Sequence, residues 1–340
     1  DPGCILKIDD SGRSQPPKQI TSSMFDAKGV CVKQWYSLSG IAKNSQNNLI
    51  EDESEAIDLL EKTLLESVQS QLISDVPLGA FLSGGIDSST IVALMSQACN
   101  HPVKTFTIGF EESAFNEAIY AKEVAKHLGT DHHELYVTAK DAFEVIPSLP
   151  SLYDEPFADS SQIPTYLVSK LARQHVTVSL SGDAGDEMFG GYNRYLWGGR
   201  VWNKIKWMPP MMRQTLGAVI QKLPTSTWDV AGHLLPNKYR VASMGDKAHR
   251  MSYRLKTVNS LDDMYYSLVT EGFNEDGLVN SNNFVLKTKL NNSNIVLGTM
   301  KSAHRMMLWD TLTYLPDDIL TKVDRAAMGV SLETRIPFLD

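Results

Sequence analysis

The sequence predicts an α/β fold, in the form of a doubly wound parallel sheet with a largely helical C-terminal part. Between residues 52 and 180, short apolar segments alternate with amphipathic segments of helical length. This alternation is typical of parallel sheets with right-handed crossovers. Two of the predicted strands end in Ser-Gly loops that lead into helices, and such connections bind anions in these folds. After about residue 192 the strand signals fade, and helical patterns rich in Trp, Met and Leu take over.

Composition and charge place the chain among ordinary globular proteins. It has 340 residues, of which 42% are hydrophobic and 21% charged, and its formal net charge is −8. There is no long run of Lys and Arg, which argues against nucleic acid as the main partner. No apolar stretch approaches the roughly 18 residues of a membrane span, so we expect no membrane partner. The three cysteines are widely spaced, which disfavours zinc and indicates reduced thiols in a cytoplasmic protein.

The first forty residues predict short strands and turns that are too few to make a domain. The segments "CILKI" and "GVCVKQWYSL" are typical of strands, and the polar linker "AKNSQNN" follows them. The chain begins without Met and stops directly after "ETRIPFLD", so we expect a fragment of a longer protein. We interpret residues 1–40 as the end of a preceding domain. Residues 41–195 then form a nucleotide-binding α/β core, and residues 196–340 form a mainly helical, truncated part.

The elements of the core follow from periodicity. A helix is predicted over residues 52–72, where apolar residues recur at helical spacing and Asp52 is placed to cap the N-terminus. Four apolar segments are predicted strands: "VPLGAFL", "VKTFTIGF", "HHELYV" and "VTVSL". Four amphipathic segments are predicted helices: "SSTIVALMSQA", "NEAIYAKEVAKHLG", "AKDAFEVIPSL" and "IPTYLVSKLARQH". Gly129 ends the second of these helices, as glycine often does.

The stretch "FLSGGIDSST" at residues 81–90 joins a predicted strand to a predicted helix. Its glycines let the backbone approach a phosphate, and its serines can add hydroxyl donors: Gly84, Gly85, Ser83, Ser88 and Ser89. Asp87 would repel a phosphate but can hold a Mg²⁺ ion that bridges phosphate oxygens. The loop lacks the lysine of a standard P-loop, which favours release of pyrophosphate over release of the γ-phosphate. From SGG alone, a plain turn in which Asp87 caps the helix is an equal alternative.

A second Ser-Gly loop, "SLSGDAGDEMFGGY", follows the predicted strand that ends at residue 180. Three acids come within five residues of one another: Asp183, Asp186 and Glu187. Because parallel strands end at the same edge of a sheet, this loop should face the same crevice as residues 81–90. Clustered acids near phosphates are costly unless they hold a metal ion or meet a cation. A solvated acidic turn is the alternative, but two Ser-Gly loops at two strand ends argue against it.

A third charged stretch, "YLPDDILTKVDRAAMGVSLETRIPFLD", covers residues 314–340. It contains Asp317, Asp318, Lys322, Asp324, Arg325, Glu333 and Arg335. For Asp317 and Asp318 a salt-bridged helix face is an equal alternative to a functional role. The guanidinium group of Arg335 can bind a substrate carboxylate or a pyrophosphate through two hydrogen bonds.

Together these stretches resemble the synthetase domain of class B, glutamine-dependent asparagine synthetases. The motifs SGGIDSS, TFTIGF, LGTDHHE, SGDAGDE-FGGY and ETRIPFLD occur in the family's order over about residues 50–340, and SGGIDSS resembles the loop of the ATP pyrophosphatase superfamily. The resemblance implies a ligase that uses ATP and Mg²⁺ to adenylylate a carboxylate, releases pyrophosphate, and lets ammonia displace AMP. Residues 1–40 resemble the end of the family's glutaminase domain, so we expect most of that ammonia source to be missing here. A homodimer is possible, and the sequence leaves the oligomeric state open.

The resemblance also implies roles for individual residues. Leu82 and Ile108 border the adenine, and Ser181 and Gly182 contact the nucleotide. The residues that hold pyrophosphate are Ser83, Gly84, Gly85, Asp87, Ser88 and Ser89. The metal ligands are Asp87 and Asp186. The catalytic residues are Asp183, near the acyl-adenylate and the incoming ammonia, and Glu333 and Arg335 in the C-terminal motif. The family's catalytic lysine is expected beyond residue 340.

The sequence departs from the family's pattern at one acid. Where asparagine synthetases have S-G-E-G-S-D-E, this chain has S-G-D-A-G-D-E, so Asp183 is one methylene shorter. That pattern is more similar to relatives that amidate sugar carboxylates in surface polysaccharide pathways, which is the alternative to aspartate. A tRNA-modifying enzyme and a non-catalytic scaffold are further alternatives, disfavoured by the acidic charge and by the intact loops. His132 and His133 are adjacent on a predicted strand and should point to opposite faces, which disfavours a shared metal.

Overall fold

The computed structural model describes residues 3–14, 25–27, 29–46, 48–110, 116–233, 236, 243–270 and 300–340. The chain divides into two compact units, one that runs to Ala56 and one that begins at Ile57. The first contains an antiparallel sheet in the order β1-β3-β2, made of β1 (Cys4–Ile8), β2 (Phe25–Ala27) and β3 (Val30–Gln34). The strand prediction at "CILKI" is therefore confirmed. In the predicted strand "GVCVKQWYSL", only Val30–Gln34 is strand, and a helix begins at Leu38.

The segment predicted as a polar linker is instead largely helical. α2 (Leu38–Ser45) begins after Ser37, whose hydroxyl accepts a hydrogen bond from the Gly40 N–H. A serine in this position satisfies one of the free N–H groups of a helix N-terminus, and the sequence reading overlooked that signal. A short helix, α1 (Asp10–Ser14), also lies in the region predicted to be turns.

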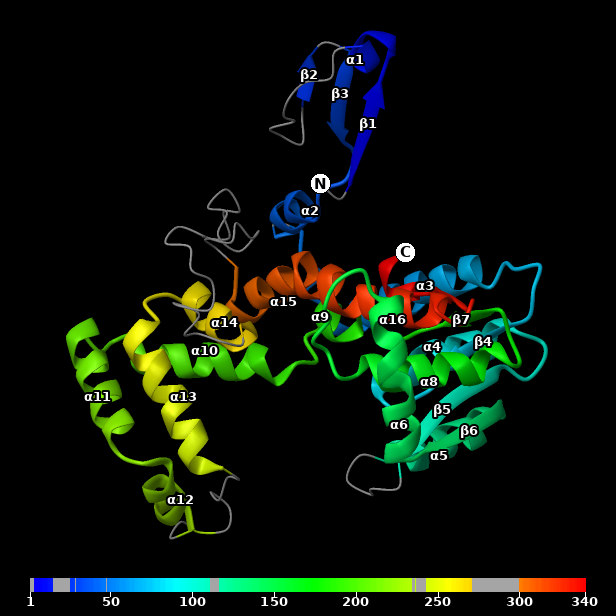
Figure 1. Cartoon of the computed structure of the whole chain (residues 1–340). Helices are drawn as coiled ribbons and strands as arrows, with labels where there is room; N and C mark the ends of the chain where they lie inside the picture. Colours follow the sequence, from blue (N-terminus) through cyan, green and yellow to red (C-terminus); the bar gives the residue numbers. More distant parts are fainter. Residues whose placement is uncertain are drawn as a thin grey trace. The chain divides into compact units, whose positions relative to one another are not determined.

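The second unit is built on five parallel strands in the order β6-β5-β4-β7-β8 (Figure 1). They are β4 (Leu78–Phe81), β5 (Lys104–Phe110), β6 (Asp131–Val137), β7 (Val178–Leu180) and β8 (Glu333–Arg335). The predicted doubly wound parallel sheet is thus confirmed. The chain adds β5 and β6 on one side of β4 and then returns to place β7 on the other side. The strand order therefore reverses between β4 and β7, and ligands bind at such reversals in open α/β sheets.

The register of the two central strands brings the Ser-Gly loops together. β4 and β7 pair in parallel with Leu78 opposite Val178 and Ala80 opposite Leu180. Because the two strands end at paired positions, the loops that begin at Ser83 and Ser181 leave the same edge of the sheet at neighbouring positions.

Helices cover both faces of the sheet. On one face, α3 (Glu53–Gln71), α4 (Ile86–Ala98) and α5 (Ala118–Leu128) share a core that includes Val68, Leu82, Met95 and Leu180. On the other, α8 (Gln162–Arg173) and α16 (Thr321–Met328) contribute to a core around Phe106. Burial on both faces explains the mainly apolar character of β4 and β7, whereas β6 and β8 at the edges of the sheet carry polar residues.

The remaining described elements are mostly helical, as predicted. They are α6 (Ala139–Val145), α7 (Leu149–Leu152), α9 (Gly185–Phe189), α10 (Asn193–Ile205), α11 (Pro210–Lys222), α12 (Thr225–His233), α13 (Met244–Thr257), α14 (Leu261–Val269), α15 (Ser302–Leu312), a π-helix (Leu315–Leu320), and short 3-10 turns at Ile146–Ser148 and Pro337–Leu339. The prediction misses β8, which pairs with β7 and returns the chain to the sheet. Among the described helices, none is long and apolar enough to cross a membrane.

Candidate active site

A cavity of about 950 Å³ opens where the two Ser-Gly loops leave the sheet. This volume is within the range of small-molecule sites. Most of the predicted site residues line it: Leu82, Ser83, Gly85, Asp87, Ser88, Ile108, Ser181, Gly182, Asp183 and Asp186. Further polar lining residues come from other segments: Thr107, Glu117, Ser161, Thr165, Glu187, Tyr192 and Lys322. The structure therefore brings together the two loops that the sequence placed at one edge of the sheet.

The first loop has the features of an anion site. Gly84 has a φ of 78°, and a Cβ there would lie 2.6 Å from the backbone nitrogen of Ala121, so this position requires glycine. α4 begins after Gly85, which makes no side-chain cap, so the first N–H groups of the helix are open to a ligand. The hydroxyl oxygens of Ser83 and Ser88 lie 2.9 Å apart beside them.

The second loop packs directly against the first. A Cβ on Gly182 would lie 2.6 Å from the backbone nitrogen of Ser88, so only glycine allows this approach. A Cβ on Gly185 would lie 2.7 Å from Oδ2 of Asp87. Ala184, between them, adopts a φ of 72°, a conformation that is rare and strained for a residue with a side chain. Strain held in a packed loop at a cavity is typical of a functional site.

Burial raises the pKa of Asp87, Asp183 and Asp186, and neighbouring acids add to the rise for Asp87 and Asp183. Burial, and then the charges of Asp186 and Asp183, raise the pKa of Asp87, and burial likewise raises the pKa of Asp186. Burial also raises the pKa of Asp183, against the hydrogen bond from the Ser181 hydroxyl and the charge of Lys322. Carboxylates crowded in this way favour a bound cation.

The acid cluster fits a magnesium ion that is shared with phosphate oxygens. In the described ranges, no three Asp, Glu, His or Cys side chains are grouped so that they could hold a metal unaided. Mg²⁺ is usually bound through one or two carboxylates, with phosphates and water completing the shell. The crowding of Asp87 and Asp186 matches that arrangement, and their assignment as ligands stays a prediction.

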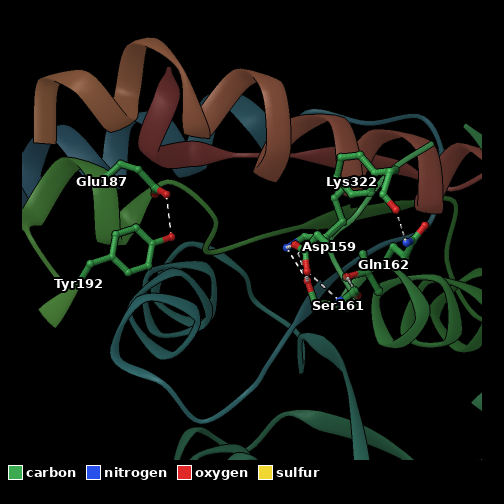
Figure 2. Close-up of polar contacts among 8 residues, drawn as sticks. Asp159, Ser161, Gln162, Glu187, Tyr192 and Lys322 are labelled. Atoms are coloured by element: carbon green, nitrogen blue, oxygen red, sulfur yellow. Dashed lines mark hydrogen bonds and ion pairs between the residues drawn. The ribbon is translucent and has the colours of Figure 1, made fainter. Parts of the chain in front are cut away.

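A buried network that the sequence reading missed supports the far wall of the cavity. Glu187 is 2% exposed and accepts a hydrogen bond of 2.7 Å from the Tyr192 hydroxyl (Figure 2). The Arg194 guanidinium stacks 3.9 Å from the centre of the Tyr192 ring and donates to the buried Asp310 at 2.9 Å. Tyr265 donates to the same carboxylate at 2.6 Å. Asp310 lies 116 residues from Arg194 and 45 from Tyr265, so no local pattern indicates these two contacts.

A second missed cluster contains the lysine of the cavity. The Lys322 ammonium group donates to Asp159 Oδ2 and to Ser161 Oγ, both at 2.8 Å (Figure 2). The hydrogen bonds from Lys322 and Ser161 lower the pKa of Asp159 even though burial opposes the shift. The sequence reading noted Lys322 as one of many charges and gave Asp159 and Ser161 no role, because they follow an ordinary polar loop.

Four predicted site residues do not line the cavity. Gly84 faces α5, and Ser89 lies outside the cavity lining. Arg335 donates to Glu333 at 2.6 Å and to the carbonyl oxygens of Gln71 and Ile73 at 2.6 and 2.9 Å. These partners occupy its guanidinium group, and its contact with a substrate anion stays a prediction. Cationic side chains often satisfy the last carbonyls of a helix, and Arg335 does this for α3.

The two adjacent histidines lie in different environments, as predicted for neighbours on a strand. Nδ1 of His132 lies 2.9 Å from the Thr105 hydroxyl oxygen. The His133 ring stacks on His175 with centroids 4.0 Å apart.

Comparison with known proteins identifies the family. The asparagine synthase family matches residues 59–340. A putative glutamine-hydrolysing asparagine synthetase 2 of Methanocaldococcus jannaschii is 36% identical over 82% of this chain and 50% of its own length. Asparagine synthetase 1 of Bacillus subtilis is 32% identical over 85% of the chain and 43% of its own length. The chain thus spans about half the length of these relatives, and it belongs to the asparagine synthase family.

Proposed function

We propose that the chain is the synthetase part of a glutamine-dependent enzyme that amidates a carboxylate with ATP, forming asparagine from aspartate. The observation that carries this proposal is that two Ser-Gly loops and three acids line one cavity. The cavity lies at the ends of β4 and β7, between which the strand order of the sheet reverses. Family membership supports the proposal, because the relatives are named asparagine synthetases. It also favours a ligase over a tRNA-modifying enzyme.

In the first step, the loops hold ATP for attack on its α-phosphorus. The N–H groups at the start of α4, with Ser83 and Ser88, receive the β- and γ-phosphates. Leu82 and Ile108 contact the adenine from the ends of β4 and β5. Mg²⁺, held by Asp87 together with Asp186, would neutralise charge on the phosphates. The acceptor carboxylate then attacks, the bond to pyrophosphate breaks, and donors already oriented in the loop stabilise the leaving charge.

In the second step, ammonia attacks the acyl carbon and displaces AMP. Asp183 lies in the cavity, burial raises the pKa of its carboxyl, and a positioned carboxylate can accept a proton. In this proposal, the Asp183 carboxylate accepts the proton that ammonia loses when it becomes an amide. The walls around Glu187 and Tyr192 limit access of water, which would hydrolyse the acyl-adenylate. In this proposal the ammonia is produced from glutamine by a part of the protein outside this chain.

One observation favours a second candidate acceptor. Asp183 is shorter than the glutamate usual in asparagine synthetases, and this leaves more space beside the Ser181 hydroxyl that donates to it. A bulkier acceptor, such as a sugar carboxylate, fits that change.

The test is to incubate the full-length protein with ATP, Mg²⁺ and ammonia, and with either L-aspartate or D-glucuronate. We expect AMP and pyrophosphate in equal amounts with one of these acids. Formation of ADP and phosphate instead would contradict the adenylate mechanism. Product with glucuronate but not with aspartate would contradict asparagine synthesis alone.

A further inference from the structure

The charge of the cavity does not match the anionic substrates of the proposed function. Its described lining carries five carboxylates, those of Asp87, Glu117, Asp183, Asp186 and Glu187. Lys322 is the one Lys or Arg side chain in that lining. A Mg²⁺ ion between Asp87 and Asp186 would offset the phosphates of ATP. The negative charges of Glu117, Asp183 and Glu187 would remain, and they would repel the carboxylate of the acceptor. The acceptor therefore needs a cationic partner of its own.

Lys322 is fixed in the cavity wall rather than extended into solvent. Its side chain projects from α16 and the residue is 9% exposed. Two of its hydrogen bonds go to Asp159 Oδ2 and Ser161 Oγ, which lie between α7 and α8. A lysine ammonium group has three donors, and these two bonds use two of them. The position of the ammonium group is therefore set by its partners, while one donor is left for a ligand.

The charge of the lysine acts on an acid of the cavity lining. Burial raises the pKa of Asp183 and of Asp318, and the positive charge of Lys322 opposes that rise in both. The charges that act on the pKa of Asp87 are those of Asp186 and Asp183, and Lys322 is not among them. Lys322 and Asp183 line the same cavity, so the cation and the acid that we assign to the ammonia step face one space.

We propose that the ammonium group of Lys322 binds the carboxylate of the acceptor substrate and holds it for attack on the α-phosphorus of ATP. This inference rests on the proposed function and adds the residue that recognises the acceptor. Asp159 and Ser161 act through Lys322, as positioning residues. The competing explanation is that Lys322 and Asp159 form an ion pair that only joins α16 to the loop before α8.

Equilibrium binding separates the two explanations without any turnover. Calorimetry would measure the affinity of the full-length protein for L-aspartate and for D-glucuronate, with Mg²⁺ and α,β-methylene-ATP present. We expect one of the two acids to bind the wild-type protein. Lys322→Met, which keeps the apolar stem, should weaken that binding about 10- to 100-fold, the range of a lost charge-assisted hydrogen bond. The affinity for α,β-methylene-ATP should change by less than about threefold.

Two further variants complete the design. Lys170→Met removes an exposed lysine of α8 outside the cavity and should leave both affinities unchanged. Ser161→Ala removes one partner of Lys322 and should weaken acceptor binding less than Lys322→Met does. The proposal is overturned if Lys322→Met binds the acid as the wild type does. It is also overturned if the loss appears in the affinity for α,β-methylene-ATP instead, or if neither acid binds the wild-type protein.

This readout is independent of the proposed reaction. If an acid binds through Lys322 but ATP gives no AMP, the proposed function fails and the assignment of Lys322 stands. If AMP and pyrophosphate form but Lys322→Met leaves acceptor affinity unchanged, the function stands and the assignment fails.

Discussion

Gly185 of the second Ser-Gly loop lies directly against the carboxylate of Asp87 in the first. A Cβ on Gly185 would lie 2.7 Å from Oδ2 and 2.8 Å from Oδ1 of that carboxylate. The two residues are almost a hundred positions apart in the chain, yet the size of one fixes the position of the other. Asp87, a proposed metal ligand, can therefore occupy its position only because Gly185 has no side chain.

Gly185→Ala should therefore lower activity and leave stability unchanged. Gly185 opens α9 in a helical conformation, where alanine is favoured over glycine by about 0.5–1 kcal/mol. The atom that must move is the end of a flexible carboxylate. We expect an unchanged melting temperature and a loss of about 100-fold in kcat/KM, since a displacement near 1 Å is enough for such a loss.

Gly182→Ala is the contrasting variant. The added Cβ would meet the backbone nitrogen of Ser88 rather than a movable side chain. We expect it to lower the melting temperature as well as the activity. Equal melting temperatures for the two variants would contradict this account of how the loops pack.

Arg335→Met should lower stability more than it lowers catalysis. The guanidinium group satisfies two carbonyl oxygens at the end of α3, and hydrogen bonds from a charged donor contribute about 1.5–3 kcal/mol. We expect a lower melting temperature with an unchanged KM for the acceptor. A raised KM at an unchanged melting temperature would instead support the role that the sequence suggested, namely contact with the substrate.

Asp186→Asn should stabilise the protein at neutral pH. Burial raises the folded-state pKa of this carboxyl above its ordinary value. The folded state therefore holds a proton that the unfolded state has already lost, so stability falls as the pH rises from the unfolded pKa through the folded one. Removing the charge should therefore raise the melting temperature near pH 7. Magnesium should stabilise the wild type more than the variant.

The histidines at the opposite end of the sheet should make the protein sensitive to acid. Burial and the neighbouring charges of His133 and Lys104 lower the pKa of His175, against the opposing charge of Asp131. Burial also lowers the pKa of His132. A lowered histidine pKa contributes stability that is present above the unfolded value and lost as pH falls through it.

His175→Gln tests this effect. The melting temperature of the wild type should fall between pH 7 and pH 5.5, and the fall should be smaller in the variant. Identical pH profiles for the two proteins would show that the stacked pair with His133 does not contribute. His132 should account for part of the fall that remains.

The sequence predicts those parts of the site that local patterns encode. The loops at Ser83 and Ser181 follow apolar strands, and the parallel-sheet rule is enough to bring them together. Lys322, Asp159 and the pair of Arg194 with Asp310 are held by contacts between distant segments, and nothing local marks them. The role predicted for Arg335 rests on guanidinium chemistry and on the resemblance of its motif to the family's. Which face of β8 its side chain occupies follows from pairing with β7, and the three polar residues of β8 gave no strand signal.

The late position of β8 in the chain has a consequence for folding on the ribosome. β4 to β7 are complete by residue 180, whereas α16 begins about 140 residues later and the edge partner β8 about 150 residues later. Pairing across such a separation closes a long loop and is intrinsically slow. A nascent chain can therefore form both Ser-Gly loops before Lys322 is synthesised. During that interval the edge of β7 is unprotected, so it is a natural site for chaperone capture or for misassembly.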